Sequence, residues 1–269
     1  MADEGWKPVG IDTTTPNAAR MYDFFLGGKD NFPADRAAAE KILEYVPEVH
    51  HVVRQNRAFL ARAVRHLAEN GIRQFIDIGT GLPTQNNVHE VAQGFLPDSR
   101  VVYVDNDPVV LAHARALLTG EGTGEVAVVE GDLHEPEKIM SDPAVRSMID
   151  FDEPVALLLL AVLHFIQDEP AGLVARLSAP LPPGSYLVIT HATPQDSRAE
   201  DVPKVMEVYA SSTSPVTLRE RDEILPFFEG FDLVDPGLVY VSQWHTEPDR
   251  VLSGPDRSRA YGGVARRPL

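Results

Sequence analysis

Two glycines and an acid follow two successive apolar segments, and they are the residues of this chain with the clearest chemistry. Residues 75–83 read Phe-Ile-Asp-Ile-Gly-Thr-Gly-Leu-Pro, and residues 101–107 read Val-Val-Tyr-Val-Asp-Asn-Asp. Gly79 and Gly81 allow the backbone to turn sharply and to approach a ligand, because they have no Cβ. Asp105 can accept hydrogen bonds from both hydroxyls of a ribose. The pair predicts a site for a nucleoside-bearing cofactor at one edge of an α/β sheet.

The glycine loop also indicates which kind of cofactor fits. A dinucleotide fingerprint, Gly-x-Gly-x-x-Gly, would place its third glycine at position 84, where this chain has Thr84. Pro83 removes one of the backbone N–H groups that a pyrophosphate would use at the start of a helix. A sulfonium cofactor has no phosphate and no such need. The alternative is a tight strand-to-helix turn without a ligand.

A third segment, 126–133, reads Val-Ala-Val-Val-Glu-Gly-Asp-Leu and predicts a short buried strand that ends at Gly131 and Asp132. We expect Asp132 at the same edge of the sheet as Gly79 and Asp105. Its carboxylate could accept a hydrogen bond from an adenine amino group. The alternative is that Asp132 only caps the next helix.

With these segments in place, the chain resembles the S-adenosylmethionine-dependent methyltransferases over about residues 72–244. In that superfamily the first glycine loop contacts the methionine part of the cofactor, the second strand's acid the ribose, and the third strand's acid the adenine. The resemblance therefore implies S-adenosylmethionine as the cofactor. The residues that it implies for cofactor binding are Asp77, Gly79, Thr80, Gly81, Asp105, Asn106, Gly131, Asp132 and Leu133.

The resemblance also implies the fold. It is an α/β, Rossmann-like methyltransferase fold with a seven-stranded, mostly parallel sheet and an N-terminal helical cap. Segments 154–160 and 183–191 look like its fourth and fifth strands. Segments 231–234 and 238–244, separated by Asp-Pro-Gly, look like its antiparallel C-terminal hairpin.

The opening segment, 11–36, is similar to a narrower group. It resembles an actinobacterial family of S-adenosyl methyltransferases that was first described as a domain of unknown function. This resemblance covers essentially the whole chain. It implies the cofactor but no settled substrate.

Capping and periodicity predict the N-terminal helices. Thr15-Pro16 and Gly27-Gly28 bound a helix over about 17–26, a second helix follows over about 34–44, and a third extends from about 47 to 70. We expect three parts: a helical cap or lid, 1–70; a cofactor-binding domain, 71–252, with a helical insertion at about 199–228; and a C-terminal tail, 253–269.

The loop between the first two helices could close over the cofactor and exclude water, with Tyr22 and Arg36 as its contacts. The alternative is a simple connecting turn. The basic C-terminal tail is expected to be solvated and mobile, and the alternative is that it covers a pocket through Tyr261.

Two histidines are candidates for catalysis. Methyl transfer requires an aligned acceptor and, for an alcohol or a protonated amine, removal of a proton. His164 and His191 follow or end the expected fourth and fifth strands, and imidazole titrates near neutral pH. Each could instead be a structural histidine. His50 and His51 lack nearby ligand partners, and no spacing suggests a metal site.

Composition limits the remaining possibilities. The chain has 269 residues, 43% of them apolar, which is enough for a sizeable core, and it has no cysteine, which excludes disulfides and thiol nucleophiles. It has no apolar stretch of about 20 residues and no signal-peptide start, so we expect a cytoplasmic protein. A net charge of −16 disfavours nucleic acid as a partner.

The sequence thus predicts a methyltransferase that acts on a small acceptor, specialised metabolites included. One alternative is an NAD-dependent oxidoreductase, which Thr84 and the expected terminal hairpin disfavour. The other is a noncatalytic S-adenosylmethionine-binding regulator, and the methyl acceptor stays open.

Overall fold

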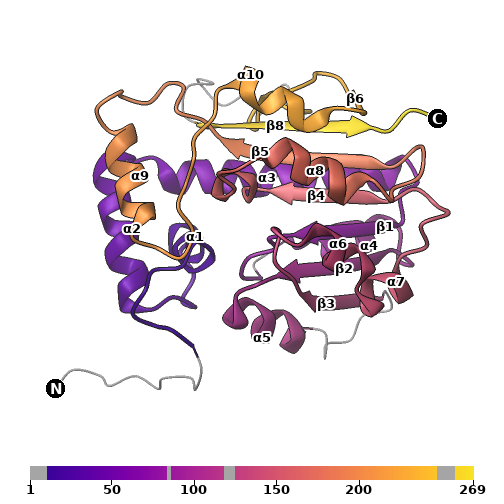
Figure 1. Cartoon of the computed structure of the whole chain (residues 1–269), viewed down its shortest axis with the longest axis horizontal. Coiled ribbons are helices and arrows are strands. Elements are labelled where there is room, and N and C mark those ends of the chain that lie inside the picture. The colour runs from indigo at the N-terminus through magenta and orange to yellow at the C-terminus, as the bar shows by residue number, and fades with distance from the viewer. Residues whose placement is uncertain (1–10, 84–85, 118–124, 247–257) are drawn as a thin grey trace.

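A computed structural model of the chain describes residues 11–83, 86–117, 125–246 and 258–269. Three parts of the sequence that were used above lie outside these ranges. They are Thr84 of the glycine loop, the first six residues, and positions 253–257 of the expected tail. A sheet runs through the centre of the molecule, with helices on both of its faces (Figure 1).

Five parallel strands form the main part of the sheet. They are β1 Gln74–Ile78, β2 Arg100–Asp105, β3 Val126–Glu130, β4 Ala156–Leu160 and β5 Tyr186–Ala192. Their order is β3-β2-β1-β4-β5, and β1 pairs with both β2 and β4 in parallel. The strand order therefore reverses between β1 and β4, and the crevice at the carboxyl ends of strands at such a point is where open α/β sheets bind ligands.

Helices cover both faces of this sheet. On one face, α3 Val49–Glu69 and α4 Val88–Phe95 pack on alternate residues of the strands. On the other face lie α6 Pro136–Ser141, α7 Pro143–Met148, α8 Pro170–Ser178 and α10 Arg221–Ile224. Because both faces are covered, the central strands are continuous apolar runs, as in the Ala-Leu-Leu-Leu-Leu of β4. The segment after β2 forms α5 Pro108–Leu117.

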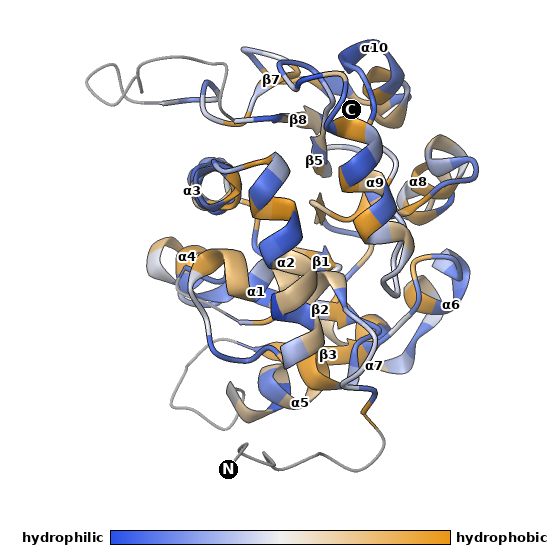
Figure 2. Cartoon of the chain, turned by 90° about the vertical axis from the view of Figure 1, so that its left-hand side faces the viewer, coloured by the Kyte–Doolittle hydropathy of each residue, from blue (hydrophilic) through white to orange (hydrophobic). Residues whose placement is uncertain are grey.

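The cap helices lie beyond the carboxyl ends of the strands. α1 Ala18–Leu26 and α2 Pro33–Tyr45 pack with α9 Val202–Ala210 around a separate apolar cluster (Figure 1). In Figure 2 the central strands are hydrophobic, whereas α2 and α9 carry hydrophilic and hydrophobic bands. The residue that caps the N-terminus of α1 is Asn17 rather than Thr15, since the side chain of Asn17 accepts hydrogen bonds from Ala19 N and Arg20 N.

The C-terminal side of the sheet is antiparallel, as predicted, but its strands are assigned differently. β8 Ala260–Arg266 lies against β5 over seven residue pairs. β6 Asp232–Leu233 and β7 Val239–Tyr240 both pair with β8 rather than with each other, so segments 231–234 and 238–244 form no hairpin. The described residues form a sheet of eight strands, where seven were expected.

Residues 260–266 therefore belong to the sheet, and the expectation of a solvated tail was wrong for them. All of them except the last are buried. A Cβ on Gly262 would lie 2.8 Å from Phe59, and one on Gly263 would lie 2.9 Å from Phe228. The two glycines allow aromatic rings from both layers of helices to approach the strand. They also interrupt the apolar pattern by which the strand could have been recognised.

Short helical turns complete the fold. η1 Leu163–Phe165 follows β4, and η2 Leu225–Phe228 follows α10. The expected insertion at about 199–228 thus contains α9, an irregular segment, α10 and η2. Its boundaries, and those of the cap, stay predictions.

Candidate functional site

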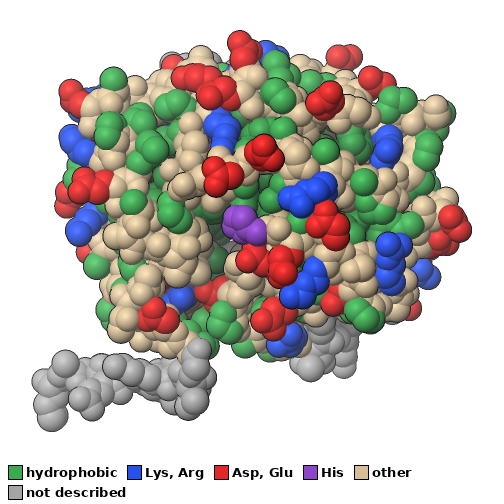
Figure 3. All heavy atoms as spheres, viewed as in Figure 1, with side chains coloured by type: hydrophobic (Ala, Val, Ile, Leu, Met, Phe, Trp, Pro, Cys, Tyr) green, Lys and Arg blue, Asp and Glu red, His purple; other side chains and the backbone are tan. Residues whose placement is uncertain are grey.

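A cavity of about 640 Å³ lies between the carboxyl ends of the strands and the cap helices. The surface on the side seen in Figure 3 is hollowed near its centre, with Asp, Glu and His side chains around the hollow. Most of the residues proposed from the sequence line the cavity. They are Tyr22, Asp77, Gly79, Thr80, Gly81, Asp105, Asn106, Asp132, Leu133, His164 and His191.

The glycine loop after β1 forms part of the cavity wall. Gly79 and Gly81 have φ angles of 72° and 67°, which residues with a Cβ rarely adopt. A Cβ on Gly79 would also lie 2.5 Å from Cγ2 of Val162. Thr80 Oγ1 closes the loop by donating to Asp77 O at 3.0 Å. The loop is therefore a tight turn whose backbone faces the cavity.

Asp105 links this loop to the next one. Its Oδ2 accepts a hydrogen bond from Gly81 N at 2.9 Å, and its Oδ1 accepts one from Asp107 N at 2.9 Å. Burial raises the pKa of Asp105. A carboxylate offers about four acceptor positions, so Asp105 can accept further hydrogen bonds from a ligand in the cavity.

Asp77 is a second buried acid of the site with a raised pKa. Its side chain is 5% exposed, and burial raises its pKa to about 7, with Arg57 opposing this shift and Asp105 adding to it. A buried carboxylate that ionises only near neutral pH is stabilised by a cationic ligand. Asp77 therefore favours a positively charged group nearby.

Asp132 lies at the cavity and also holds the turn that follows β3. Its Oδ1 accepts a hydrogen bond from His134 N at 2.9 Å. Asp132 does not cap the next helix, because the N-cap residue of α6 is Glu135. Gly131 does not line the cavity, since a Cβ there would lie 2.8 Å from Val104 and 2.9 Å from Ile139. It is required for packing beside the site.

Tyr22 and Arg36, the two residues expected to contact the cofactor from the cap, differ in whether they reach the cavity. Tyr22 lines the cavity, and its hydroxyl donates to Val53 O at 3.1 Å. Arg36 is not among the residues that line the cavity, because its guanidinium donates to Asn31 O at 2.7 Å and to Asn31 Oδ1 at 3.1 Å. Arg36 therefore holds the loop together.

The two candidate histidines, His164 and His191, differ in their hydrogen-bond partners. Both ring nitrogens of His191 have partners: Nδ1 lies 2.7 Å from Ala192 O, and Nε2 lies 3.1 Å from Arg219 Nη1. Burial lowers the pKa of His191 to about 4, and Arg219 adds to the shift. Nδ1 of His164 is buried and has no hydrogen-bond partner among the described residues. Burial, with smaller contributions from His191 and Arg219, holds the pKa of His164 well below its ordinary value.

Sequence reasoning missed two residues of α3 that line the cavity, Asn56 and Arg57. The apolar face of α3 contains Val53 and Leu60, and Asn56 lies three residues after the first and four before the second. A polar residue within an apolar stripe is the signal that could have identified Asn56. Arg57 Nη2 donates to Asn86 O at 3.2 Å.

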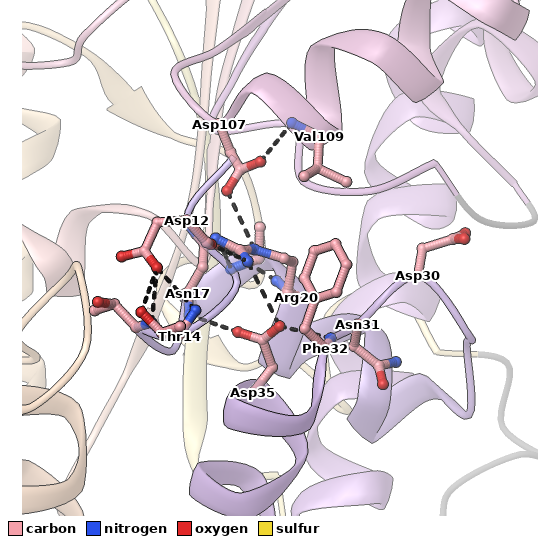
Figure 4. A network of polar contacts seen from close by, with 12 residues as sticks. Asp12, Thr14, Asn17, Arg20, Asp30, Asn31, Phe32, Asp35, Asp107 and Val109 are labelled. Carbon is pink, nitrogen blue, oxygen red and sulfur yellow. Dashed lines mark hydrogen bonds and ion pairs between the residues drawn. The ribbon is translucent and has the colours of Figure 1, made fainter. Parts of the chain in front are cut away.

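A buried network fastens the cap to the site. Figure 4 shows Arg20 of α1 between the carboxylates of Asp35 and Asp107. Arg20 Nη1 lies 3.7 Å from Asp35 Oδ2, and Arg20 Nε lies 3.4 Å from Asp107 Oδ2. Because Asp107 N donates to Asp105, the cap is connected to the carboxylate at the centre of the site.

Two features, a metal site and a membrane-crossing helix, are not found in the described ranges. They contain no group of three or more His, Cys, Asp or Glu residues that could hold a metal ion. They also contain no helix long and apolar enough to cross a membrane.

Comparisons with known proteins agree with this geometry. The chain is similar to a solved structure of a DUF574 family protein from Streptomyces avermitilis, with 43% identity, a TM-score of 0.91, and coverage of 96% of this chain and 99% of the other. A protein of Thermobifida fusca described as a candidate methyltransferase has 40% identity, a TM-score of 0.88, and coverage of 98% and 99%.

A more distant structure shows the fold alone. The N-methyltransferase NodS of Bradyrhizobium japonicum, solved with S-adenosylhomocysteine, has 12% identity, a TM-score of 0.52, and coverage of 93% of this chain and 100% of its own. A search of curated proteins found no match. The profile of a family described as S-adenosyl methyltransferase matches residues 4–268. This chain therefore belongs to the S-adenosyl methyltransferase family, whose cofactor is S-adenosylmethionine.

Proposed function

We propose that this protein methylates a small molecule inside the cavity between the sheet and the cap. The observation that supports this proposal is that one cavity is lined both by the loops after β1, β2 and β3 and by side chains of α1, α3 and α9. Its volume of about 640 Å³ lies within the range of about 300–1,000 Å³ that is usual for ligand pockets. Such a cavity can place two small molecules next to each other.

The residues at the strand ends fit the cofactor by their chemistry. We assign Asp105 to the two ribose hydroxyls and Asp132, with Leu133, to the adenine. The loop of Gly79 to Gly81 leaves backbone groups accessible for the methionine part. Asp77 suits its positively charged groups, because burial makes an ionised Asp77 costly unless a cation is near.

Arg57 is the last residue that we assign to the cofactor. It is the single Lys or Arg among the described residues that line the cavity, and it is close enough to Asp77 to lower the pKa of that carboxyl. We assign it to the carboxylate of the cofactor. When bound, the cofactor supplies a methyl group that is already activated by its sulfonium. The protein then has to align the acceptor and manage one proton.

We assign the proton to His164. His164 lines the cavity and is neutral at pH 7, and because its lowered pKa makes it a weak base, it can take a proton only from a strongly acidic group such as an oxygen that has just been methylated. As the acceptor's oxygen or nitrogen gains the methyl group, it releases a proton, which His164 takes. His191 cannot easily replace it, because Arg219 donates to Nε2 of His191 while Nδ1 of His191 donates to Ala192 O. The family match does not favour the nicotinamide alternative.

Calorimetric titration tests the cofactor site. The wild type, Asp105→Ala and the control Asp98→Ala are titrated with S-adenosylmethionine, S-adenosylhomocysteine and NAD. Asp98 is a suitable control because its side chain is 68% exposed at a surface ion pair. We expect micromolar binding of the first two ligands. Asp105→Ala should lose at least about 10-fold in affinity, since a hydrogen bond to a charged group contributes about 1.5–3 kcal/mol.

The opposite results are equally informative. Binding of NAD alone would exclude the proposed function. Unchanged affinity in Asp105→Ala would exclude the assignment of Asp105 to the ribose. Loss of affinity in Asp98→Ala as well would show that the effect is not specific to the site.

A further inference from the structure

The segment after β4 forms a continuous part of the cavity wall. We call residues 161–168 the β4 loop, and all of them except Leu163 line the cavity. The loop begins at Ala161, which has a φ of 53°, and is followed by Glu169, which has a φ of 46°. Residues with a Cβ rarely adopt this left-handed region, which costs about 1–3 kcal/mol at each position. Such a conformation persists only where neighbouring groups hold it in place.

Arg219 holds this loop without lining the cavity itself. Its side chain is buried, and it lies in the irregular segment between α9 and α10. Nη1 donates to Leu163 O at 3.2 Å, and Nη2 donates to Ile166 O at 2.8 Å and to Gln167 O at 3.4 Å. One planar guanidinium thus serves carbonyl groups at three positions of the β4 loop.

The same guanidinium is also fastened to the sheet. Nη1 of Arg219 lies 3.1 Å from Nε2 of His191. Because a guanidinium can only donate, Nε2 must accept, and the proton of the neutral His191 is on Nδ1, which lies 2.7 Å from Ala192 O. Two residues earlier in the chain, Thr217 N donates to His164 O at 2.7 Å. The segment of Arg219 therefore joins the β4 loop to β5.

The charge of Arg219 is costly at this position. Burial lowers the pKa of its guanidinium, with Glu223 opposing the shift, and none of its four hydrogen-bond partners is a carboxylate. An apolar side chain of similar volume would avoid the cost of burying a charge. It would also leave the three carbonyls of the β4 loop without these donors. We therefore attribute the charge to the conformation of the loop.

We propose that Arg219 is a positioning residue, which sets the places of His164 and Phe165 in the cavity wall through its contacts with the β4 loop and with His191. This inference rests on the proposed function, since those two side chains border the molecule that would be methylated. The centroid of the Phe165 ring lies 4.3 Å from that of His164 and 5.9 Å from that of Tyr209 in α9. The contacts of Arg219 thus keep three rings of the lining together.

Three variants test this proposal. Arg219→Met keeps the length of the side chain but removes its donors. Arg219→Lys keeps the charge but lacks the planar fork that serves the carbonyls and the imidazole together. Arg62→Met is the matched control, because Arg62 also donates to two backbone carbonyls, of Val241 and Trp244, and does not line the cavity.

Two NMR measurements on the protein without ligand report the arrangement. Nitrogen spectra of labelled histidines show which ring nitrogen of His191 carries the proton, and nuclear Overhauser effects between the rings of Phe165 and Tyr209 show the place of the β4 loop. We expect the proton on Nδ1 and clear ring-to-ring effects in the wild type. In Arg219→Met the ring-to-ring effects should be lost, and the Nε2 resonance should move downfield because Nε2 loses its donor. Arg219→Lys should be intermediate, and Arg62→Met should leave both signals unchanged even where it lowers the melting temperature.

Three results would overturn the proposal. The first is a proton on Nε2 of His191 in the wild type, which needs no variant. The others are unchanged signals in whichever Arg219 variant folds, and the same losses in Arg62→Met as in Arg219→Met. Binding of S-adenosylhomocysteine is measured separately by calorimetry. A wild type that does not bind it would overturn the proposed function, whereas the NMR signals would still report the contacts of Arg219.

Discussion

The two parts of the cavity are built in different ways. At the ends of β1, β2 and β3, the walls consist of short loops in which backbone groups and carboxylates are tied together, as in the contacts of Asp105 with Gly81 and Asp107. On the opposite side of the cavity, side chains from α1, α3, α9 and the segment after β4 form the walls. The first part depends on a rigid sheet, and the second depends on how separate helices pack.

This difference has a functional consequence. Loops at the ends of hydrogen-bonded strands can hold the same cofactor in many proteins, because the sheet positions them. The helices can change their side chains without disturbing that arrangement. We therefore expect substitutions at the strand ends to affect cofactor binding and folding, and substitutions in the helical walls of the cavity to affect which molecule is methylated.

The largest effect should come from the link between the two parts. In Arg20→Leu, the buried carboxylates of Asp35 and Asp107 lose their shared cation, and removal of one partner from a buried ion pair costs about 3–5 kcal/mol. Urea denaturation should show this decrease in the free energy of unfolding. Arg65→Leu is the control, since its ion pair with Glu69 is exposed and should contribute less than about 1 kcal/mol. Equal stability of the two variants would show that the cap is not fastened through Arg20.

The glycine loop should show the next largest effect. Gly79→Ala introduces both an unfavourable positive φ and a contact with Val162, whereas Gly81→Ala introduces only the positive φ, since nothing lies within 4 Å of its Cβ. Backbone strain costs about 1–3 kcal/mol, and overpacking adds about 1–3 kcal/mol. Thermal unfolding should therefore rank Gly79→Ala below Gly81→Ala. Val162→Ala should recover part of the loss in Gly79→Ala but not in Gly81→Ala, and recovery in both would contradict this explanation.

The buried side chain of His191 in β5 predicts a pH dependence of stability. The pKa of His191 is about 4 in the folded protein and about 6.5 when unfolded, so the unfolded state binds more protons between these values. The contribution of His191 is complete above pH 6.5 and decreases as the pH falls towards 4. From pH 6.5 to pH 5 the loss is about 2 kcal/mol.

Comparison with His191→Gln isolates this contribution. The free energy of unfolding of the wild type should fall more steeply between pH 6.5 and pH 5 than that of the variant. Groups such as Asp77, whose pKa is raised, affect both proteins alike. Parallel curves for the two proteins would show that His191 does not titrate with a lowered pKa.

The smallest effect is expected for Tyr22→Phe. This change removes the hydroxyl that donates to Val53 O and accepts from Asn56 Nδ2, and a net hydrogen bond contributes about 1 kcal/mol. Thermal unfolding should show a loss of about that size. Tyr45→Phe is the control, because the ring of Tyr45 lies against Lys204 and the change keeps the ring. A loss in Tyr45→Phe as large as that in Tyr22→Phe would mean that the hydroxyl of Tyr22 has no special role.

Local sequence was sufficient for most of the main fold. The strands before Gly79 and Asp105 could be predicted because an apolar run followed by a turn is encoded within a few residues. The helix over Val49–Glu69 could be predicted because its apolar side chains repeat with the period of an α-helix. β8 could not, since its Gly262 and Gly263 lack side chains that would mark a strand, and its place beside β5 depends on contacts with Phe59 and Phe228.

By itself, the sequence determined the parallel strands of the α/β sheet and the turns at the ends of β1, β2 and β3, because each of these is written in one continuous segment. Only the tertiary structure decided that Arg36 is directed to Asn31, that Arg219 contacts Nε2 of His191, and that Asn56 and Arg57 line the cavity. The contact of Arg219 with His191 joins two separate elements, and even the contact of Arg36 with the nearby Asn31 depends on how the loop between α1 and α2 folds. The physical reason is that a side chain's hydrogen-bond partners, and hence its remaining chemistry, are settled by packing between elements.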